Sequence, residues 1–206
     1  MKRFSPLLLL VLSFNSLMAQ SDREEGKSGG LKKENIFTGG NVTASFFNGS
    51  TILGISPFFG YSINRYLDVA VSGNLNYTSQ RDYVQYGDKV RQMVYGPGAF
   101  VRLFPVRFLF AQAQYEHNFI KEKYIPASNG TYLPSTQKYD VNSLLIGGGY
   151  TSGREGVGSS YYYLSIMWDV AKQANSPYVD GLARSFPVIR AGYQIALFQG
   201  KGSRRR

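Results

Sequence analysis

The chain has 206 residues, a formal net charge of +10 and no cysteine. Its length suits a single domain. The missing cysteines exclude disulfides, thiolate metal sites, a cysteine nucleophile and a lipidated N-terminal cysteine. The chain also has a single histidine, His117, so we expect no metal site and no cofactor.

The first residues have the order of a secretory signal peptide. Lys2 and Arg3 precede an apolar run that begins at Leu7, and the small residue Ala19 follows this run. The run is shorter than the roughly 20 residues of a membrane-spanning helix, which disfavours the alternative of a retained N-terminal anchor. We therefore expect residues 1–19 to be cleaved during export.

If the chain is exported, its excess of positive charge indicates which partners it meets. An exported chain seldom meets nucleic acid, so we expect no nucleic-acid partner. Anionic lipid headgroups and lipopolysaccharide are the partners that a basic envelope protein meets. Residues 20–35 are charged and glycine-rich, and they predict a flexible periplasmic leader because they hold too few apolar residues to pack.

From Ile36 on, apolar and polar residues alternate in segments bounded by turns. The clearest segment is 67–78, in which Leu67, Val69 and Val71 share one face while Asp68 and Ser72 share the other. Seven further segments lie before or after it in the chain, and each shows the same two-residue alternation or a similar length. The predicted strands are 36–46, 53–63, 67–78, 93–104, 109–119, 139–150, 162–170 and 189–197.

Eight strands form an even number, as in the single-chain barrels of bacterial outer membranes. The long connections are 79–91, 121–137 and 171–186, which predicts that they are extracellular and that both termini are periplasmic. We expect an all-β fold, an eight-stranded antiparallel up-and-down transmembrane β-barrel over residues 36–198, with a basic C-terminal tail over 199–206. The facing of 139–150 stays unassigned, and a bulge there is one explanation.

In the strands whose facing can be assigned, the charged residues all fall on the polar face. On the lipid face an Arg or Lys near the midplane would cost roughly 2–4 kcal/mol. An eight-stranded barrel is just narrow enough for side chains to fill it, so we predict a sealed lumen with at least one acidic–basic pair. The residues expected to form this lumen charge network are Asp68, Arg102, Glu116, Asp169 and Arg190.

Several segments resemble strands of the small OmpA/OmpX-like outer-membrane barrels of gram-negative bacteria. They are NIFTGGNVTASF, FLFAQAQYE, SLLIGGGY, and SPY followed by PVIRAGYQIAL. The resemblance covers nearly all of the chain after the signal and implies a stand-alone barrel in the cell outer membrane. The last strand also resembles the signal read by the barrel-assembly machinery, although the chain continues for eight residues beyond Phe198.

We expect a structural or surface-interaction protein without catalysis, whose loops could bind an extracellular ligand. One alternative is a lipid A-modifying enzyme, a deacylase or acyltransferase, for which His117 beside Glu116 would be the catalytic candidates. A second alternative is a secreted soluble β-sandwich that acts as a binding module, because a sandwich also alternates polar and apolar residues. Aromatic residues near the strand ends favour the barrel, where they would form interface girdles.

Overall fold

The computed structural model describes residues 30–47, 49–128, 130, 132–180 and 182–199. The predicted signal peptide (1–19), residues 20–29 of the predicted leader and residues 200–206 of the predicted tail lie outside these ranges. No helix in the described ranges is long and apolar enough to cross a membrane.

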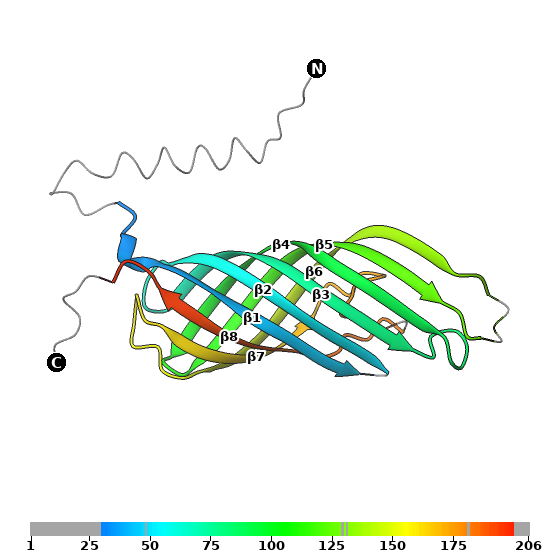
Figure 1. Ribbon diagram of the computed structural model, residues 1–206. Helices are drawn as coiled ribbons and strands as arrows, with labels where there is room; N and C mark the ends of the chain where they lie inside the picture. Colours follow the sequence, from blue (N-terminus) through cyan, green and yellow to red (C-terminus); the bar gives the residue numbers. More distant parts are fainter. Residues whose placement is uncertain (1–29, 48, 129, 131, 181, 200–206) are drawn as a thin grey trace, which may run out of the picture. The chain divides into compact units, whose positions relative to one another are not determined.

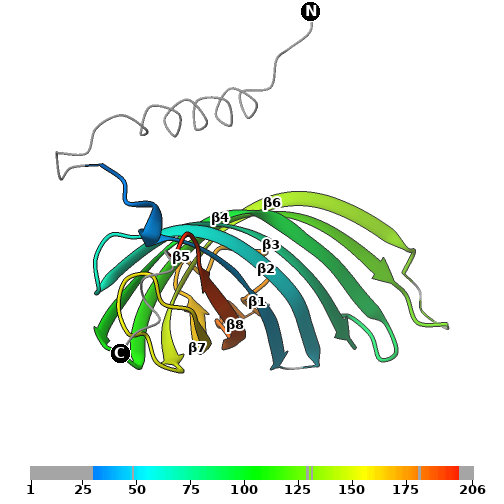
Figure 2. The same ribbon diagram turned by 60° about the vertical axis from the view of Figure 1, so that its left-hand side comes forward.

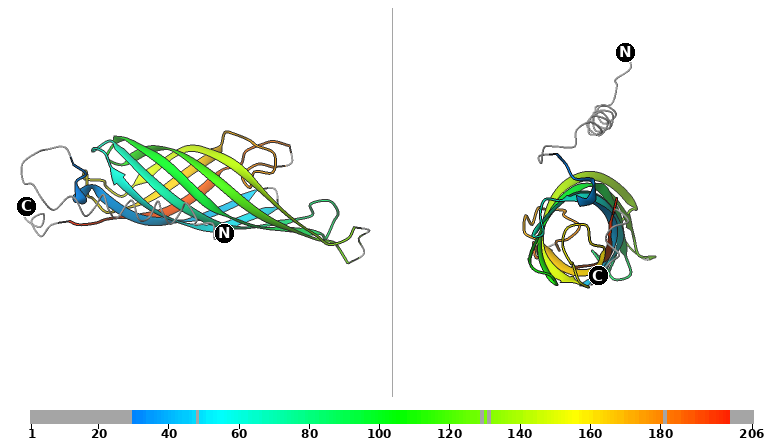
Figure 3. Two further views of the ribbon diagram at one scale, coloured as in Figure 1. Left: turned by 90° about the horizontal axis from the view of Figure 1, so that it is seen from above. Right: turned by 90° about the vertical axis from the view of Figure 1, so that its left-hand side faces the viewer.

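Eight antiparallel strands close into a ring, each bonded to its neighbours in sequence and β8 bonded to β1, which confirms the predicted fold class (Figure 1, and end-on in Figure 3). A short 3₁₀ turn, η2 (Lys33–Asn35), precedes the first strand. The strands are β1 (Ile36–Phe47), β2 (Ser50–Ser62), β3 (Leu67–Arg81), β4 (Lys89–Val106), β5 (Leu109–Ile125), β6 (Ser135–Thr151), β7 (Tyr161–Asp169) and β8 (Val188–Ala196).

The two faces of the barrel wall differ in chemistry, and the alternation in the sequence determines which residue points where. Along β7, Tyr161, Tyr163 and Ser165 are buried in the lumen, while Leu164 and Trp168 are exposed on the outside. The same holds around the ring. Exposed outward residues include Val42, Leu53, Ile55, Val71, Leu75, Val101, Leu103, Ala113, Ile146, Leu164, Ile166 and Ile189.

Strands β3 to β6 are longer than the sequence predicts. They have 15 to 18 residues, whereas β7 and β8 have nine. The additional pairs lie at the end of the barrel opposite to Ile36 and Ala196, which we call the loop end. There β3 to β6 extend beyond the other strands as a one-sided wall (Figure 2). The predicted loops 79–91 and 121–137 are correspondingly shorter, with connections at 82–88 and 126–134.

The strand whose facing the sequence left open, β6, pairs with β5 in unbroken register, so the suggested bulge is wrong. Its pattern was ambiguous for another reason. Leu145 points inward and is fully buried with Met167, while Leu144 and Ile146 are exposed on the outside. Gly147 also faces inward, where a Cβ would overlap the carbonyl oxygen of Ile166. Apolar residues therefore occur on both faces.

Two prolines lie within strands, each where pairing is interrupted. The β2–β3 register omits Pro57, and the β4–β5 register omits Pro97. Proline has no backbone N–H, so it removes one ladder donor at each position. Both strands keep their other neighbour at these points, since Pro57 pairs with Gly40 and Pro97 with Gly73.

Candidate functional site

The lumen holds all five charged residues that the sequence placed on the polar face of the strands. Each is at most 1 % exposed. Glu116 and Arg190 are in direct contact with each other. Asp68 and Arg102 have partners that the sequence did not indicate, and Asp169 lies at the loop end of its strand.

Glu116 and Arg190 form the central ion pair. Arg190 donates from Nη2 to Oε1 of Glu116 at 2.8 Å and from Nη1 to Oε1 of Gln114 at 2.9 Å. The other carboxylate oxygen of Glu116 accepts the hydroxyl of Tyr178 at 2.7 Å, and Asn76 donates to that hydroxyl at 3.1 Å. A buried carboxylate is stable only when its lone pairs are satisfied in this way. The group links β5, β8, β3 and the β7–β8 connection across the lumen.

Arg102 lies in the lumen with neutral partners. Its Nε donates to Oε1 of Gln112 at 3.0 Å, and Nη1 donates to Tyr161 and to Gln194 at 3.3 and 3.4 Å. The guanidinium also lies 4.4 Å from the centre of the Tyr163 ring, within the range of a cation–π interaction. Further rings at 5.0 and 4.6 Å belong to Phe100 and Phe110.

The end of the lumen opposite to the loop end is closed by an arginine that sequence reasoning missed. Arg154 lies in the β6–β7 connection, and its side chain is buried at this end of the lumen. Its Nη2 lies 2.6 Å from Oδ1 of Asp68. Its guanidinium lies 3.9 Å from the centre of the Phe104 ring and also donates to the backbone oxygens of Asn64 and Arg65. Only 3 % of the Arg154 surface is exposed. Because Arg154 lies in a loop, the alternation of a strand does not apply to it, and no sequence signal predicted this burial.

Asp169 has a different role from the ion pairs. Its carboxylate accepts backbone N–H groups from Leu144 and Ala171 and the hydroxyl of Ser176 at 2.6 Å. These bonds hold the start of the β7–β8 connection, residues 170–187, against the middle of β6, at Leu144. Asp169 therefore shapes the connection that enters the lumen.

The β7–β8 connection, for which the sequence predicts only a long extracellular loop, folds back into the barrel mouth. Tyr178 is fully buried, and Phe186 is 5 % exposed. Both pack in a cluster with Ile52, Leu145 and Met167. Because the Tyr178 hydroxyl also contacts Glu116, this connection plugs the lumen from the loop end.

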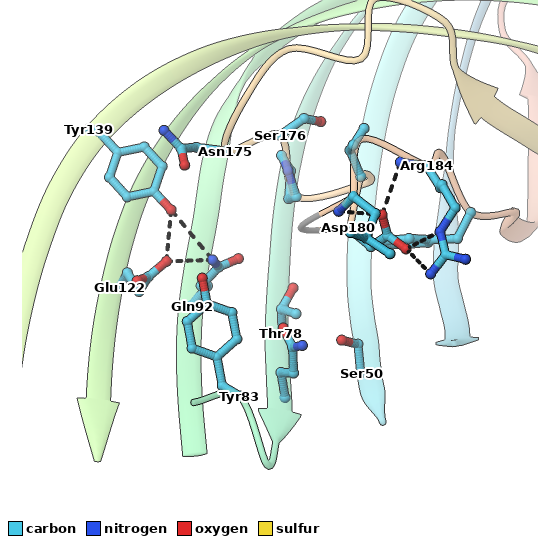
Figure 4. A pocket seen from close by; sticks show the side chains of 15 residues that line it. Ser50, Thr78, Tyr83, Gln92, Glu122, Tyr139, Asn175, Ser176, Asp180 and Arg184 are labelled. Atoms are coloured by element: carbon cyan, nitrogen blue, oxygen red, sulfur yellow. Dashed lines mark hydrogen bonds and ion pairs between the residues drawn. The ribbon is translucent and has the colours of Figure 1, made fainter. Parts of the chain in front are cut away.

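Above this plug lies a cavity of about 390 Å³ at the loop end, which we call the cup. Strands β2 to β6 form one side and the β7–β8 connection forms the other (Figure 4). The side chains that line it are mainly hydroxyls, amides and carboxylates. They include Ser50, Thr78, Gln80, Tyr83, Gln92, Glu122, Tyr139, Asn175, Asp180 and Arg184.

The strand side of the cup carries a small hydrogen-bonded group. One carboxylate oxygen of Glu122 accepts Nε2 of Gln92 at 2.6 Å and the hydroxyl of Tyr139 at 2.8 Å (Figure 4). Thr78, on the neighbouring strand, is 93 % buried, with 7 % of its surface exposed, and among the described residues its hydroxyl has no hydrogen-bond partner. An unsatisfied buried hydroxyl costs free energy, which a ligand or water in the cup would recover.

Opposite this group, Asp180 and Arg184 form the rim of the cup (Figure 4). Asp180 accepts the backbone N–H of Arg184 at 2.9 Å and the backbone N–H of Leu182 at 2.9 Å. It also pairs with the Arg184 guanidinium at 2.8 Å. The backbone N–H of Arg184, followed by its side chain, holds the pKa of the Asp180 carboxyl below its usual range. Asp180 thus stays charged at neutral pH and links Leu182 and Arg184 within the rim.

The β3–β4 hairpin beside the cup is held by another carboxylate. Asp88 accepts the backbone N–H groups of Tyr83, Val84 and Gln85 at 2.6 to 2.9 Å and the hydroxyl of Tyr124 at 3.0 Å. Burial alone would raise its pKa, but the three backbone donors and Tyr124 outweigh this effect and lower the pKa of Asp88 below its usual range. The hairpin is therefore tied to β5.

The two catalytic candidates of the enzyme alternative lie on opposite faces of the wall. Glu116 points into the lumen, whereas His117 points outward. Nδ1 of His117 is 2.7 Å from Oδ1 of Asn142, and its ring packs edge-on against Phe119 at 4.8 Å. Neighbouring residues on a strand alternate in direction, so these two side chains do not converge on one substrate.

No family model matches the chain, and no curated protein matches its sequence. Among solved structures, it is similar to Ail, the attachment invasion locus protein of Yersinia pestis, at 11 % identity and a TM-score of 0.44, over 78 % of this chain and 96 % of Ail. Two further similar structures are the N-terminal β-barrel domain of Pseudomonas aeruginosa OprF and Neisserial surface protein A. Each has 12 % identity and a TM-score of 0.40, with coverage of 78 % and 84 % of this chain and 95 % and 99 % of theirs.

The fold is established by the closed strand order of this chain itself.

Proposed function

We propose that this chain is a non-catalytic outer-membrane β-barrel with a sealed lumen, which acts at the cell surface through its loop end. The outer face supports the membrane location. Val42, Ile55, Val71 and Leu164 are each more than half exposed, and they belong to a continuous apolar wall. A contiguous apolar surface of this size is unfavourable in water and favourable in lipid.

The observation that carries the proposal is the filling of the lumen. The ion pair between Asp68 and Arg154 fills one end of the lumen, and the ion pair between Glu116 and Arg190 fills its centre. Tyr178 fills the lumen from the loop end. A solute that crossed the barrel would have to separate two buried ion pairs, and breaking one such pair costs about 3–5 kcal/mol. The barrel therefore serves as a scaffold and does not serve as a pore.

In this proposal both termini are periplasmic and the cup faces outward. The cup then offers a polar ligand the free hydroxyl of Thr78 and the second carboxylate oxygen of Glu122. Its partners would be an extracellular ligand of this polar kind, outer-membrane lipids with lipopolysaccharide around the wall, and the barrel-assembly machinery during insertion.

Fractionation and electrophysiology test the proposal together. We expect the protein in the outer-membrane fraction, a gel mobility that changes on boiling, and negligible conductance from purified protein in planar bilayers. A chain that stays in the soluble fraction without a mobility change would support the secreted β-sandwich instead. A large, steady conductance would refute the sealed lumen.

Nothing specific favours the lipid A-modifying alternative, because His117 and Glu116 are on opposite sides of the wall. We expect a lipid A fraction incubated with purified protein to keep all its acyl chains. Acyl loss that disappears in His117→Ala would refute the non-catalytic assignment.

A further inference from the structure

A strip of cations lies on the outside of the barrel wall, near the loop end of β3 to β6. Their outward direction follows from the strand alternation. On β3, β4 and β5 they share parity with the exposed outward residues Tyr77, Tyr95 and Phe119, and on β6 Lys138 shares parity with the exposed outward residues Leu144 and Ile146. Lys89 is half-buried and the others are exposed. The basic strip consists of Arg81, Lys89, Arg91, Lys121, Lys123 and Lys138.

The register places these cations side by side. Arg91 pairs with Lys123, Arg81 pairs with Lys89, and Lys121 pairs with Lys138. Residues directly opposite each other on neighbouring strands have Cβ atoms roughly 4.5–5.5 Å apart, and like charges in such pairs are destabilising. Three like-charged pairs in one strip therefore need an anion to offset their repulsion.

The protein itself supplies little of that anion. In the described ranges, no cation of the strip makes an ion pair. Glu122 lies between Lys121 and Lys123 along β5 but points into the cup. Asp140 faces outward two residues from Lys138 and offers one carboxylate beside six cations.

The height of the strip on the wall indicates the kind of anion. On β5 the outward residues from Leu109 to Phe119 are apolar or aromatic except for His117, and the next outward residue is Lys121. Ten residues of a strand tilted by about 40° rise roughly 25 Å, which matches the apolar band of an outer-membrane barrel. The cations thus begin where the hydrocarbon ends, at the level of the lipid headgroups.

The strip is also confined to one flank. At the loop end of β1 and β2, level with Arg91, the outward residues Phe46 and Thr51 are uncharged. Strand β7 ends lower on the wall, where its outward residue Trp168 pairs with Ile146. A general attraction to the membrane surface would not require the cations to lie on one side of the barrel. A binding site for a single lipid molecule would require this.

We propose that the basic strip binds the phosphate groups of lipid A in lipopolysaccharide, with the acyl chains lying against the apolar face of β3 to β6 below it. The height and the leaflet rest on the outer-membrane orientation proposed above. Arg91 and Arg81 supply planar, two-pronged donors for phosphate oxygens, and the lysines act as point charges. Tyr95 and Phe119 mark the boundary between headgroup and chains.

The test measures lipopolysaccharide binding to the purified full chain, folded in detergent micelles, by native mass spectrometry. The triple variant K121Q/K123Q/K138Q removes three charges from the strip. The control R65Q/R107Q/K172Q removes three exposed charges elsewhere. Each cation near an anionic lipid surface contributes about 5-fold to binding, so we expect roughly 100-fold weaker binding for the strip variant and little change for the control.

Four ligands separate the sources of the anion. Intact lipopolysaccharide should bind the native chain in a salt-sensitive way, and a dephosphorylated preparation should bind it about as weakly as intact material binds the strip variant. Phosphatidylglycerol in the same micelles and free inorganic phosphate should compete poorly. Equal loss in the control variant, unchanged binding by the strip variant, or equal binding of phosphatidylglycerol would overturn the inference.

These outcomes are distinct from failure of the proposed function. Wrong localisation or a large conductance would appear in fractionation and in planar bilayers, whereas the micelle assay reports only on the strip. Heat-modifiable gel mobility of both triple variants serves as the folding check.

Discussion

Separating the charges of Glu116 and Arg190 should destabilise the barrel more than any exposed substitution. Glu116 is fully buried and accepts three donors, from Arg190, Gln114 and Tyr178, at 2.7 to 2.9 Å. Arg190→Met leaves the carboxylate with two neutral donors, and Glu116→Gln leaves the guanidinium with neutral acceptors. Breaking a buried pair from one side costs about 3–5 kcal/mol. Since some donors remain, we expect about 3 kcal/mol for each single variant.

The double variant E116Q/R190M identifies the cause of that loss. Two independent losses would add to about 6 kcal/mol, whereas removal of both charges leaves no uncompensated ion in the lumen. We therefore expect the double variant to lose about 3 kcal/mol, as much as either single one, with a coupling energy of about 3 kcal/mol. Its lumen should remain sealed, because the substituted side chains still fill the space.

Urea unfolding in lipid vesicles measures these differences. Trp168 is the only tryptophan of the chain and lies on the outer wall, so its fluorescence reports whether the lipid-facing strand is in place. With a slope of about 1–3 kcal/mol per molar urea, a loss of 3 kcal/mol shifts the midpoint by roughly 1–3 M. Additive losses in the double variant, or a loss below about 1 kcal/mol in both singles, would refute the reasoning.

Three further outcomes follow from individual contacts. Tyr178→Phe keeps the ring in the lumen but removes its hydrogen bond to Glu116, so we expect a loss of about 1.5–3 kcal/mol in the same urea assay without a gain in conductance. Gly96→Ala would place a Cβ on the carbonyl oxygen of His117 and should abolish heat-modifiable folding, whereas Gly73→Ala, which meets no atom within 4 Å, should fold normally. The pKa of Asp88 is lowered in the folded chain, so its support of the β3–β4 hairpin is complete above about pH 3.9 and is lost as the pH falls through the folded pKa. NMR spectra in micelles should show the hairpin amides shift together over that acid range, and unchanged amides down to pH 2 would contradict this assignment.

The barrel could be predicted from sequence because one rule with a period of two residues governs the whole wall. The segment 67–78 illustrates this, since its predicted lumen residue Asp68 is fully buried and its predicted outward residue Val71 is 62 % exposed. The strand ends were harder to predict. Beyond the membrane the outward residues Lys121 and Lys123 are charged, so the apolar half of the pattern stops while the hydrogen-bonded ladder continues.

The partners inside the lumen were less accessible to sequence reasoning. Alternation shows that Arg102 faces inward, but it does not show which side chains on the far side of the ring approach it. Contacts across a barrel depend on the tilt and register of all eight strands. Arg154 and Tyr178 come from connections, where no periodic pattern applies, and their burial follows from the space that the ring leaves to be filled.

The unequal strand lengths have a consequence for the surrounding lipid. At a tilt of about 40°, the nine residues of β7 and of β8 rise roughly 23 Å, slightly less than the apolar band of a typical outer-membrane barrel. The flank formed by β4 and β5, with 18 and 17 residues, rises far above that band. A short hydrophobic flank is matched by local thinning of the bilayer. We therefore expect this protein to sit beside a thinned patch of membrane at β7 and β8 and beside a bilayer of full thickness at β4 and β5, so that it imposes a gradient of thickness on the lipids around it.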